Sequence, residues 1–91
     1  MRGIDAPHPE GMLRKVHLPD EDELAFRRTL GQRLRELRVP KFSQDEFADV
    51  IDVFRSRMST IERGKIALQL STARRIAKAL GIELDELLKL E

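Results

Sequence analysis

The residues best suited to chemistry lie in the segment 55–60. Ser56 and Thr60 are four residues apart, so a helix would place them on one face, and Arg55 and Arg57 accompany them with no acidic residue in between. Guanidinium groups and hydroxyls donate hydrogen bonds to phosphate oxygens and to base edges in a DNA major groove. The segment therefore indicates a nucleic-acid-binding face. A solvated helix face with ordinary charges is the alternative that the residues alone leave open.

The distribution of charge favours the first interpretation. The net charge is only +1 for 91 residues, which by itself is a weak argument against nucleic acid. Residues 54–78, however, contain seven basic residues and one acidic residue, a net charge of +6. The flanking segments carry net charges of −2 (residues 1–53) and −3 (residues 79–91). The positive charge is thus concentrated where the candidate contacts lie.

A strong helix start precedes this segment. Ser43 has the properties of an N-cap, and Glu46, three residues later, can complete a capping box. The phenylalanines at positions 42 and 47 can close around this start as a hydrophobic staple. The helix is expected to run to about Ile51, with Phe47, Val50 and Ile51 on its buried face.

A second short helix must follow almost at once. Its apolar pair, Met58 and Ile61, begins only a few residues later, so residues 52–54 can form no more than a tight turn. Two short helices joined by about three residues have the geometry of a helix-turn-helix. Gly64 is expected to end the second helix.

Three more helices are expected around this pair. The first follows an N-cap at Asp20, ends near Arg38 before Pro40, and buries Phe26, Leu30, Leu34 and Leu37. Its arginines, Arg33 among them, are expected on a solvated face. The fourth helix runs from about Ser71, capped by Ser71 or Thr72, to Leu80, with Arg74, Arg75 and Lys78 outward and Gly81 at its end. The fifth covers about Leu84 to Leu90 and carries more leucine than it can bury, which favours an interface with a second subunit.

The first 19 residues form an N-terminal arm before a domain at 20–91. Pro and Gly interrupt the arm, which favours a flexible tail. The alternatives are a short edge strand at 12–18 or a DNA-contacting arm that uses Arg2, Arg14 and Lys15. His8 and His17 lie here without cysteine or paired carboxylates, so no metal site is expected.

Composition excludes several classes of protein. The chain has no Cys, which rules out disulfides and thiolate metal sites and suits a reducing cytoplasm. No stretch approaches the length of a membrane span, and no secretory signal is visible. Neither a nucleophile–base pair nor a phosphate-binding loop is present, so the chain is not expected to be an enzyme or to need a cofactor.

Four runs of residues carry a family resemblance: LGQRLRELR, SQDEFA, MSTIERGK and RRIAKALGIELDELL. Together they span about Leu30 to Leu88, and they resemble the DNA-binding domain of Cro and lambda-type phage repressors, the XRE family. The resemblance implies an all-α, five-helix, lambda-repressor-like helix-turn-helix domain. It also implies that the third helix enters the major groove.

The resemblance and the residue pattern together assign roles to individual residues. The expected base-reading residues are Arg55, Ser56, Arg57 and Thr60. The expected phosphate-binding residues are Ser43, Gln44, Arg63 and Lys65. The expected structural ion pair is Arg38 with Glu62, with Arg35 as the alternative arginine. The expected dimer interface is Leu68, Leu87 and Leu90.

This chain departs from the family pattern at two positions of the turn. Asp52 stands where the family has Gly with a positive φ, a conformation that Asp tolerates better than other residues with side chains. Phe54 stands where the family has a capping Ser or Thr, and Phe cannot cap. Packing of Phe54 into the core is favoured over contact with a thymine methyl group.

The function expected from the sequence is that of a sequence-specific transcriptional regulator. It would bind double-stranded DNA as a homodimer and act as a repressor on a palindromic operator. The alternative is an antitoxin-like module that binds a partner enzyme through residues 1–19 and also binds its own operator.

Overall fold

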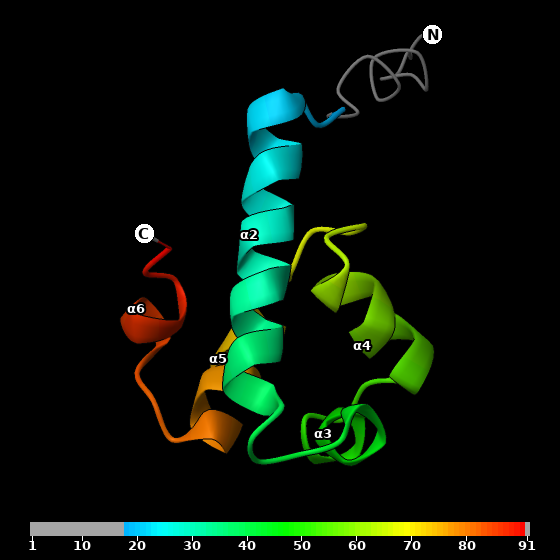
Figure 1. The fold of residues 1–91 in the computed structure, drawn as a ribbon, viewed down its shortest axis with the longest axis vertical. Helices are drawn as coiled ribbons and strands as arrows, with labels where there is room; N and C mark the ends of the chain where they lie inside the picture. The colour runs from blue at the N-terminus through cyan, green and yellow to red at the C-terminus, as the bar shows by residue number, and fades with distance from the viewer. Residues whose placement is uncertain (1–17, 91) are drawn as a thin grey trace, which may run out of the picture.

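Five helices account for all the regular structure of residues 18–90, the part of the chain that this computed structural model describes. They are α2 (Glu21–Arg38), α3 (Gln44–Val50), α4 (Arg55–Glu62), α5 (Leu70–Leu80) and α6 (Leu84–Leu87). The long α2 runs through the middle of the molecule, with α3 and α4 on one side and α6 on the other (Figure 1). The expected all-α, five-helix architecture is confirmed. The expectations for His8, His17, the strand and the arm contacts lie outside the described residues.

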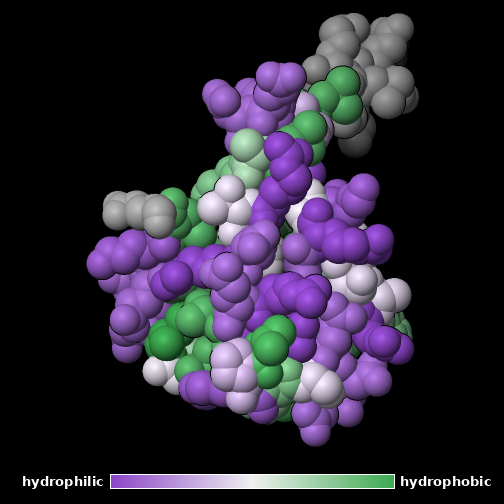
Figure 2. Space-filling view, in the orientation of Figure 1, coloured by the Kyte–Doolittle hydropathy of each residue, from purple (hydrophilic) through white to green (hydrophobic). Residues whose placement is uncertain are grey.

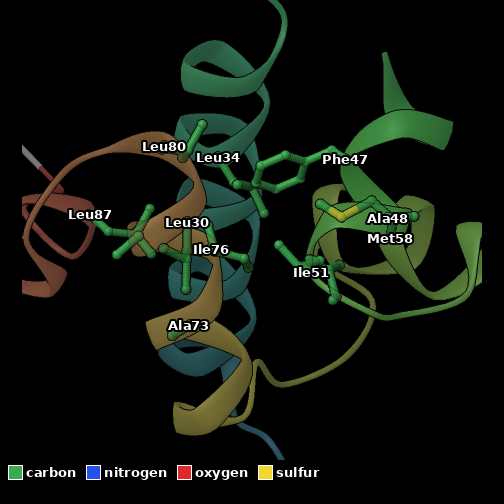
Figure 3. Packing of buried hydrophobic residues seen from close by; sticks show 12 residues of the cluster. Leu30, Leu34, Phe47, Ala48, Ile51, Met58, Ala73, Ile76, Leu80 and Leu87 are labelled. Carbon is green, nitrogen blue, oxygen red and sulfur yellow. The ribbon is translucent and has the colours of Figure 1, made fainter. Parts of the chain in front are cut away.

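The core draws apolar side chains from all five helices (Figure 3). Its fully buried large residues are Leu34, Phe47, Ile51, Met58, Ile76 and Leu87. Two residues expected in the core are exposed instead: Phe26 to 50 % and Val50 to 54 %. Phe26 lies in the first half of α2, where it lines an open hollow with Ile66 and Leu68 instead of joining the core. Val50 lies at the end of α3, where Ile51 takes the buried position.

Side chains cap the helices α2 and α3 as expected. Asp20 accepts a hydrogen bond of 2.8 Å from the backbone N–H of Glu23. The capping box is complete, because Ser43 Oγ accepts from the Glu46 N–H and Glu46 Oε1 accepts from the Ser43 N–H. The hydrogen bond that the Ser43 backbone N–H donates to the carboxylate stabilises its charged form and holds the pKa of Glu46 below its usual value.

The two later helices each differ from expectation at one end, whereas α5 ends at Leu80 before Gly81 and α6 starts at Leu84, both as expected. Helix α5 starts at Leu70 after an N-cap at Gln69, and no side chain caps it. The proposed cap Thr72 is instead buried inside the helix. Helix α6 is only four residues long, because Leu88 already leaves helical geometry.

Three basic side chains join the helices by donating to carbonyls at helix ends. Arg33 on α2 donates from Nη2 to Glu86 O at 2.6 Å and from Nε to Leu87 O at 3.1 Å. Arg75 donates from Nε to Ile51 O at 2.9 Å, and Lys41 donates from Nζ to Leu80 O at 3.0 Å. Arg33 is therefore half-buried rather than fully solvated, whereas Arg75 is exposed as expected and also makes this hydrogen bond. Helix C-terminal carbonyls lack intrahelical partners and attract such cations.

The turn between α3 and α4 depends on Asp52. Its φ is +61°, the left-handed conformation that the family's glycine would adopt. This conformation lets the N–H of the next residue, Val53, donate to Ala48 O at 2.9 Å. The expectation that Asp52 can replace glycine here is confirmed.

Gly31 brings the backbones of α2 and α4 together, a role that the sequence did not reveal. A Cβ atom at Gly31 would lie 2.4 Å from Glu62 O and 2.7 Å from Ile61 O. Gly64, just past α4, has a φ of +72°, and a Cβ there would lie 2.7 Å from the Cα of Arg28. The end of α4 is therefore held directly against α2, with no side chain between them.

We expect Gly31→Ala to lower the free energy of unfolding by about 1–3 kcal/mol, because the added methyl group meets rigid backbone. Helix propensity alone predicts the opposite sign, since Ala is preferred to Gly in a helix by about 1 kcal/mol. Urea denaturation measures the difference. The matched control is Gln32→Ala, at the exposed neighbouring position. A Gly31→Ala variant as stable as the natural protein would contradict the close approach.

Candidate nucleic-acid interface

Helix α4 has one buried face and one open face. Met58, Ile61 and Glu62 are buried, whereas Arg55, Ser56 and Arg57 are exposed. Thr60, the fourth residue of the expected base-reading set, is half-buried. Hydrophilic residues cover the larger part of the surface on the side shown, including the region of α4 (Figure 2). The structure therefore brings the four expected base-reading residues together on one short helix.

Phe54, the N-cap residue of α4, is 83 % exposed and makes no side-chain cap. The expectation that it packs into the core was wrong. Its backbone is extended (φ −70°, ψ 147°), and successive side chains of an extended chain point in opposite directions. Val53 takes the inward direction and packs against the core. Phe54 is consequently turned toward solvent at the start of the open face.

Arg55 is paired with a residue that the sequence analysis did not single out. Its Nε lies 2.9 Å from Oδ1 of Asp45, which is in the first turn of α3. The side chains are 69 % and 67 % exposed, so this ion pair adds little to stability. Because this contact uses Nε, a second acceptor would be met by the two terminal nitrogens. Paired N–H donors of an arginine match the O6 and N7 acceptors of guanine.

The hydroxyl of Thr60 is already engaged inside its own helix. Its Oγ1 donates to Ser56 O at 2.7 Å, so the hydroxyl proton is used and the oxygen can only accept. An acceptor of this kind suits the exocyclic amino groups of adenine and cytosine. Thr60 also lines a shallow hollow on this face, together with Phe54, Ser56, Arg57 and Ile66.

The expected phosphate-binding residues divide into two pairs. Ser43 uses its N–H and accepts through its hydroxyl in the capping box, and Gln44 donates from Nε2 to Glu62 Oε1 at 3.1 Å. Arg63 and Lys65 lie exposed at the C-terminal end of α4, although Arg63 Nε also approaches Ser59 O at 3.4 Å. Arg63 and Lys65 therefore have the cationic groups open to an anion. Ser43 and Gln44 have part of their hydrogen-bonding capacity committed.

The ion pair expected between Arg38 and Glu62 is present and buried. Arg38 Nε lies 2.5 Å from Glu62 Oε2, and Arg38 Nη2 lies 3.0 Å from Glu62 Oε1, with side chains 7 % and 2 % exposed. Arg38 Nη1 donates to Phe42 O at 2.9 Å. Arg35, the alternative partner, is exposed. With Gln44 also bound to Glu62, this network fixes the end of α4 to α2 and to the start of α3.

The expected dimer residues do not share one environment. Leu87 is fully buried in the core of its own chain, so its assignment to an interface was wrong. Burial follows because α6 turns Leu87 inward onto the cluster that includes Ile76 and Leu80 (Figure 3). Leu68 and Leu90 pack against the core but keep part of their surface exposed.

Two leucines that the expected interface omitted offer more apolar surface. Leu70 is 66 % exposed and Leu88 is 39 % exposed. Leu70 follows Leu68 by two residues, and Leu88 precedes Leu90 by two. Leu70 therefore adds apolar surface next to Leu68 in the sequence, and Leu88 adds apolar surface next to Leu90.

Neither a metal-binding group nor a membrane helix was found in the described part of the chain. Within residues 18–90, no three His, Cys, Asp or Glu side chains cluster in a way that could hold a metal ion. The helices in the same range are too short or too polar to cross a bilayer.

A short helix held rigidly across a partner helix, with arginines and hydroxyls on its open face, defines a DNA-binding helix-turn-helix. Comparison with known proteins agrees: the family model described as a helix-turn-helix domain matches residues 29–90. The chain belongs to this family, and within it to the Cro and lambda-type (XRE) regulators. It is a sequence-specific DNA-binding regulator.

Two curated relatives are control proteins. Control protein C.BamHI of Bacillus amyloliquefaciens is 38 % identical over 65 residues, which cover 69 % of this chain and 80 % of that protein. Control protein C.MunI of a Mycoplasma species is 42 % identical over 59 residues, which cover 63 % of this chain and 80 % of that protein. The chain thus matches four-fifths of the length of each.

Solved structures of similar fold include another controller. The restriction-modification controller protein C.AhdI of Aeromonas hydrophila superimposes with a TM-score of 0.66 at 39 % identity, covering 69 % of this chain and 97 % of that one. A hypothetical transcription factor, NHTF, from Neisseria has a TM-score of 0.66 at 36 % identity, covering 80 % and 81 %. These proteins share both fold and sequence with the chain.

Proposed function

We propose that this protein regulates transcription in the cytoplasm by binding paired half-sites of an operator as a homodimer, with α4 in the major groove. The observation that carries the proposal is the exposed start of α4, where Arg55, Ser56 and Arg57 point away from the core. The N-terminal residues of a recognition helix are those that reach base edges. The buried Arg38–Glu62 pair supplies the rigid support that such reading needs.

The roles of single residues follow from their surroundings. Arg55 reads guanine with its terminal nitrogens, Ser56 and Arg57 contact bases beside it, and Thr60 accepts from an amino group. Arg63 and Lys65 hold phosphates at the other end of α4. Gln44, at the start of α3, contacts the DNA backbone with the side-chain hydrogen-bonding groups that its bond to Glu62 does not use.

The genes under control are those of a restriction–modification system. Three of the similar proteins support this step: two are named control proteins, and C.AhdI is described as a restriction-modification controller. A reading frame for a methyltransferase or an endonuclease beside the gene is the expected finding. A neighbourhood without either would separate the chain from these controllers while leaving DNA binding intact.

Dimer formation would use the apolar surface at Leu68 and Leu90, extended by Leu70 and Leu88. The support is chemical: a small domain that exposes apolar side chains at neighbouring positions gains stability by covering them. A dimer also pairs two recognition helices with two half-sites about one turn of DNA apart.

Selection of bound sites from a random duplex pool tests the proposal directly. We expect enrichment of a two-fold symmetric sequence, whose half-site spacing reports the dimer. Binding to the selected duplex should fall with salt with a log–log slope of roughly −5 to −9, if each subunit neutralises about three to five phosphates. A slope near zero, or no enrichment, would contradict the proposal.

A further inference from the structure

Phe54 is the most exposed large apolar side chain of residues 18–90. It is 83 % exposed, compared with 50 % for Phe26 and 66 % for Leu70. Aromatic side chains of this size are major contributors to the apolar area that binding buries. Its position, however, is the start of the helix proposed to enter the DNA groove, where a polar capping residue would be more favourable. At this position α4 therefore lacks a side-chain cap and has an exposed aromatic ring instead.

The backbone of Phe54 is fixed to α4 although the side chain is free to solvent. Phe54 O accepts hydrogen bonds of 3.0 Å from the N–H groups of Arg57 and Met58, and Met58 is fully buried. The next residue, Arg55, is held by Asp45. The ring therefore leaves the helix from a defined point beside an arginine already oriented by its neighbour. It also lines the hollow with Ser56 and Thr60.

The DNA major groove offers a specific partner for such a ring. Its floor presents hydrogen-bond donors and acceptors, and the C5-methyl group of thymine is the apolar feature among them. We propose that Phe54 reads the C5-methyl group of a thymine within the half-site, next to the bases that Arg55 and Ser56 contact. This proposal rests on the proposed function, because it requires α4 to lie in the major groove.

Removal of the methyl group alone tests the proposal. In the selected duplex, each thymine of one half-site is replaced in turn by deoxyuridine, which keeps the base pair and all its hydrogen bonds. We expect one position at which the natural protein loses affinity about fourfold, the value for withdrawing one methyl group from apolar contact. Fluorescence anisotropy titrations at constant salt measure the change.

The variant Phe54→Ala links the effect to this side chain. It should bind the thymine duplex more weakly than the natural protein does, and it should bind the thymine and deoxyuridine duplexes equally. Phe54→Leu should retain part of the preference because it retains an apolar group. Phe26→Ala, which removes a half-exposed phenylalanine ring from α2, is the control and should keep the full preference. Urea denaturation of each variant confirms folding.

A 5-methylcytosine arm identifies the source of the methyl group. The sensitive T·A pair is replaced by C·G with and without the C5-methyl group. If the duplex with 5-methylcytosine binds more tightly than the duplex with cytosine, Phe54 contacts the methyl group on either base. If the two duplexes bind equally, the contact is specific to thymine.

Two failures remain distinguishable. If the selected duplex binds no better than random DNA, the proposed function fails. If it binds specifically but the natural protein and Phe54→Ala respond identically at all deoxyuridine positions, the methyl reading by Phe54 is overturned while the function stands. A Phe54→Ala variant that binds DNA normally but loses dimers would assign the ring to a subunit contact and would also overturn the proposal.

Discussion

Arg38→Ala is expected to lower the free energy of unfolding by about 3–5 kcal/mol. The substitution leaves the carboxylate of Glu62, whose side chain is 2 % exposed, without its cation. Gln44 continues to donate to Glu62 Oε1 but supplies no charge. The N–H donor to Phe42 O is also lost. Urea denaturation followed by circular dichroism measures the difference.

Two further variants show whether the loss comes from the stranded charge. Arg38→Met combined with Glu62→Leu removes both charges and should be much more stable than either single variant, because an apolar pair of similar volume often replaces a buried ion pair at little cost. Arg35→Ala removes an exposed arginine one turn away and should change stability by less than about 0.5 kcal/mol. A double variant as unstable as Arg38→Ala would argue against the charge explanation.

Arg55→Ala should weaken binding to the selected operator by about 1–3 kcal/mol while leaving binding to random duplexes nearly unchanged. The reason is that the terminal nitrogens of Arg55 are proposed to contact a base, and base contacts carry the sequence preference. Competition titrations with both duplexes at one salt concentration give the ratio of specific to non-specific affinity.

Lys65→Ala is the matched comparison, because Lys65 is also exposed and cationic but lies beyond the end of α4. Its loss should weaken binding to all duplexes alike and reduce the salt slope by about one. Equal losses on both duplexes for both variants would mean that α4 is only a phosphate-binding face. The regulator would then need a different source of sequence preference.

Features whose partners lie within a few residues along the chain could be predicted from residue types and their spacing. The capping box of Ser43 and Glu46 and the cap at Asp20 need only local backbone hydrogen bonds, so their residue types and spacing were sufficient. The left-handed conformation of Asp52 was expected because the resembled family has a glycine with positive φ at that position. The distant Arg38–Glu62 pair was also predictable, but only because a family resemblance supplied the pairing.

The burial of individual side chains could not be predicted from the sequence, because it depends on elements that lie far away along the chain. Val53 and Phe54 are adjacent and apolar, yet the arrangement of the core turns Val53 inward and leaves Phe54 exposed. Phe26 shares the periodicity of Leu30 and Leu34, but it lines an open hollow with Ile66 and Leu68, so half of its surface stays exposed.

The same reason explains the contacts that the sequence concealed. Arg33 meets the carbonyls of α6 more than fifty residues away, and Gly31 meets the backbone at Glu62. Leu87 belongs to the core because α6 folds back onto α5, which no periodicity within a four-residue helix can indicate. Residue type and spacing therefore predicted where α2 and α3 begin. The packing of α2, α4 and α6 determined which side chains remain available to a partner.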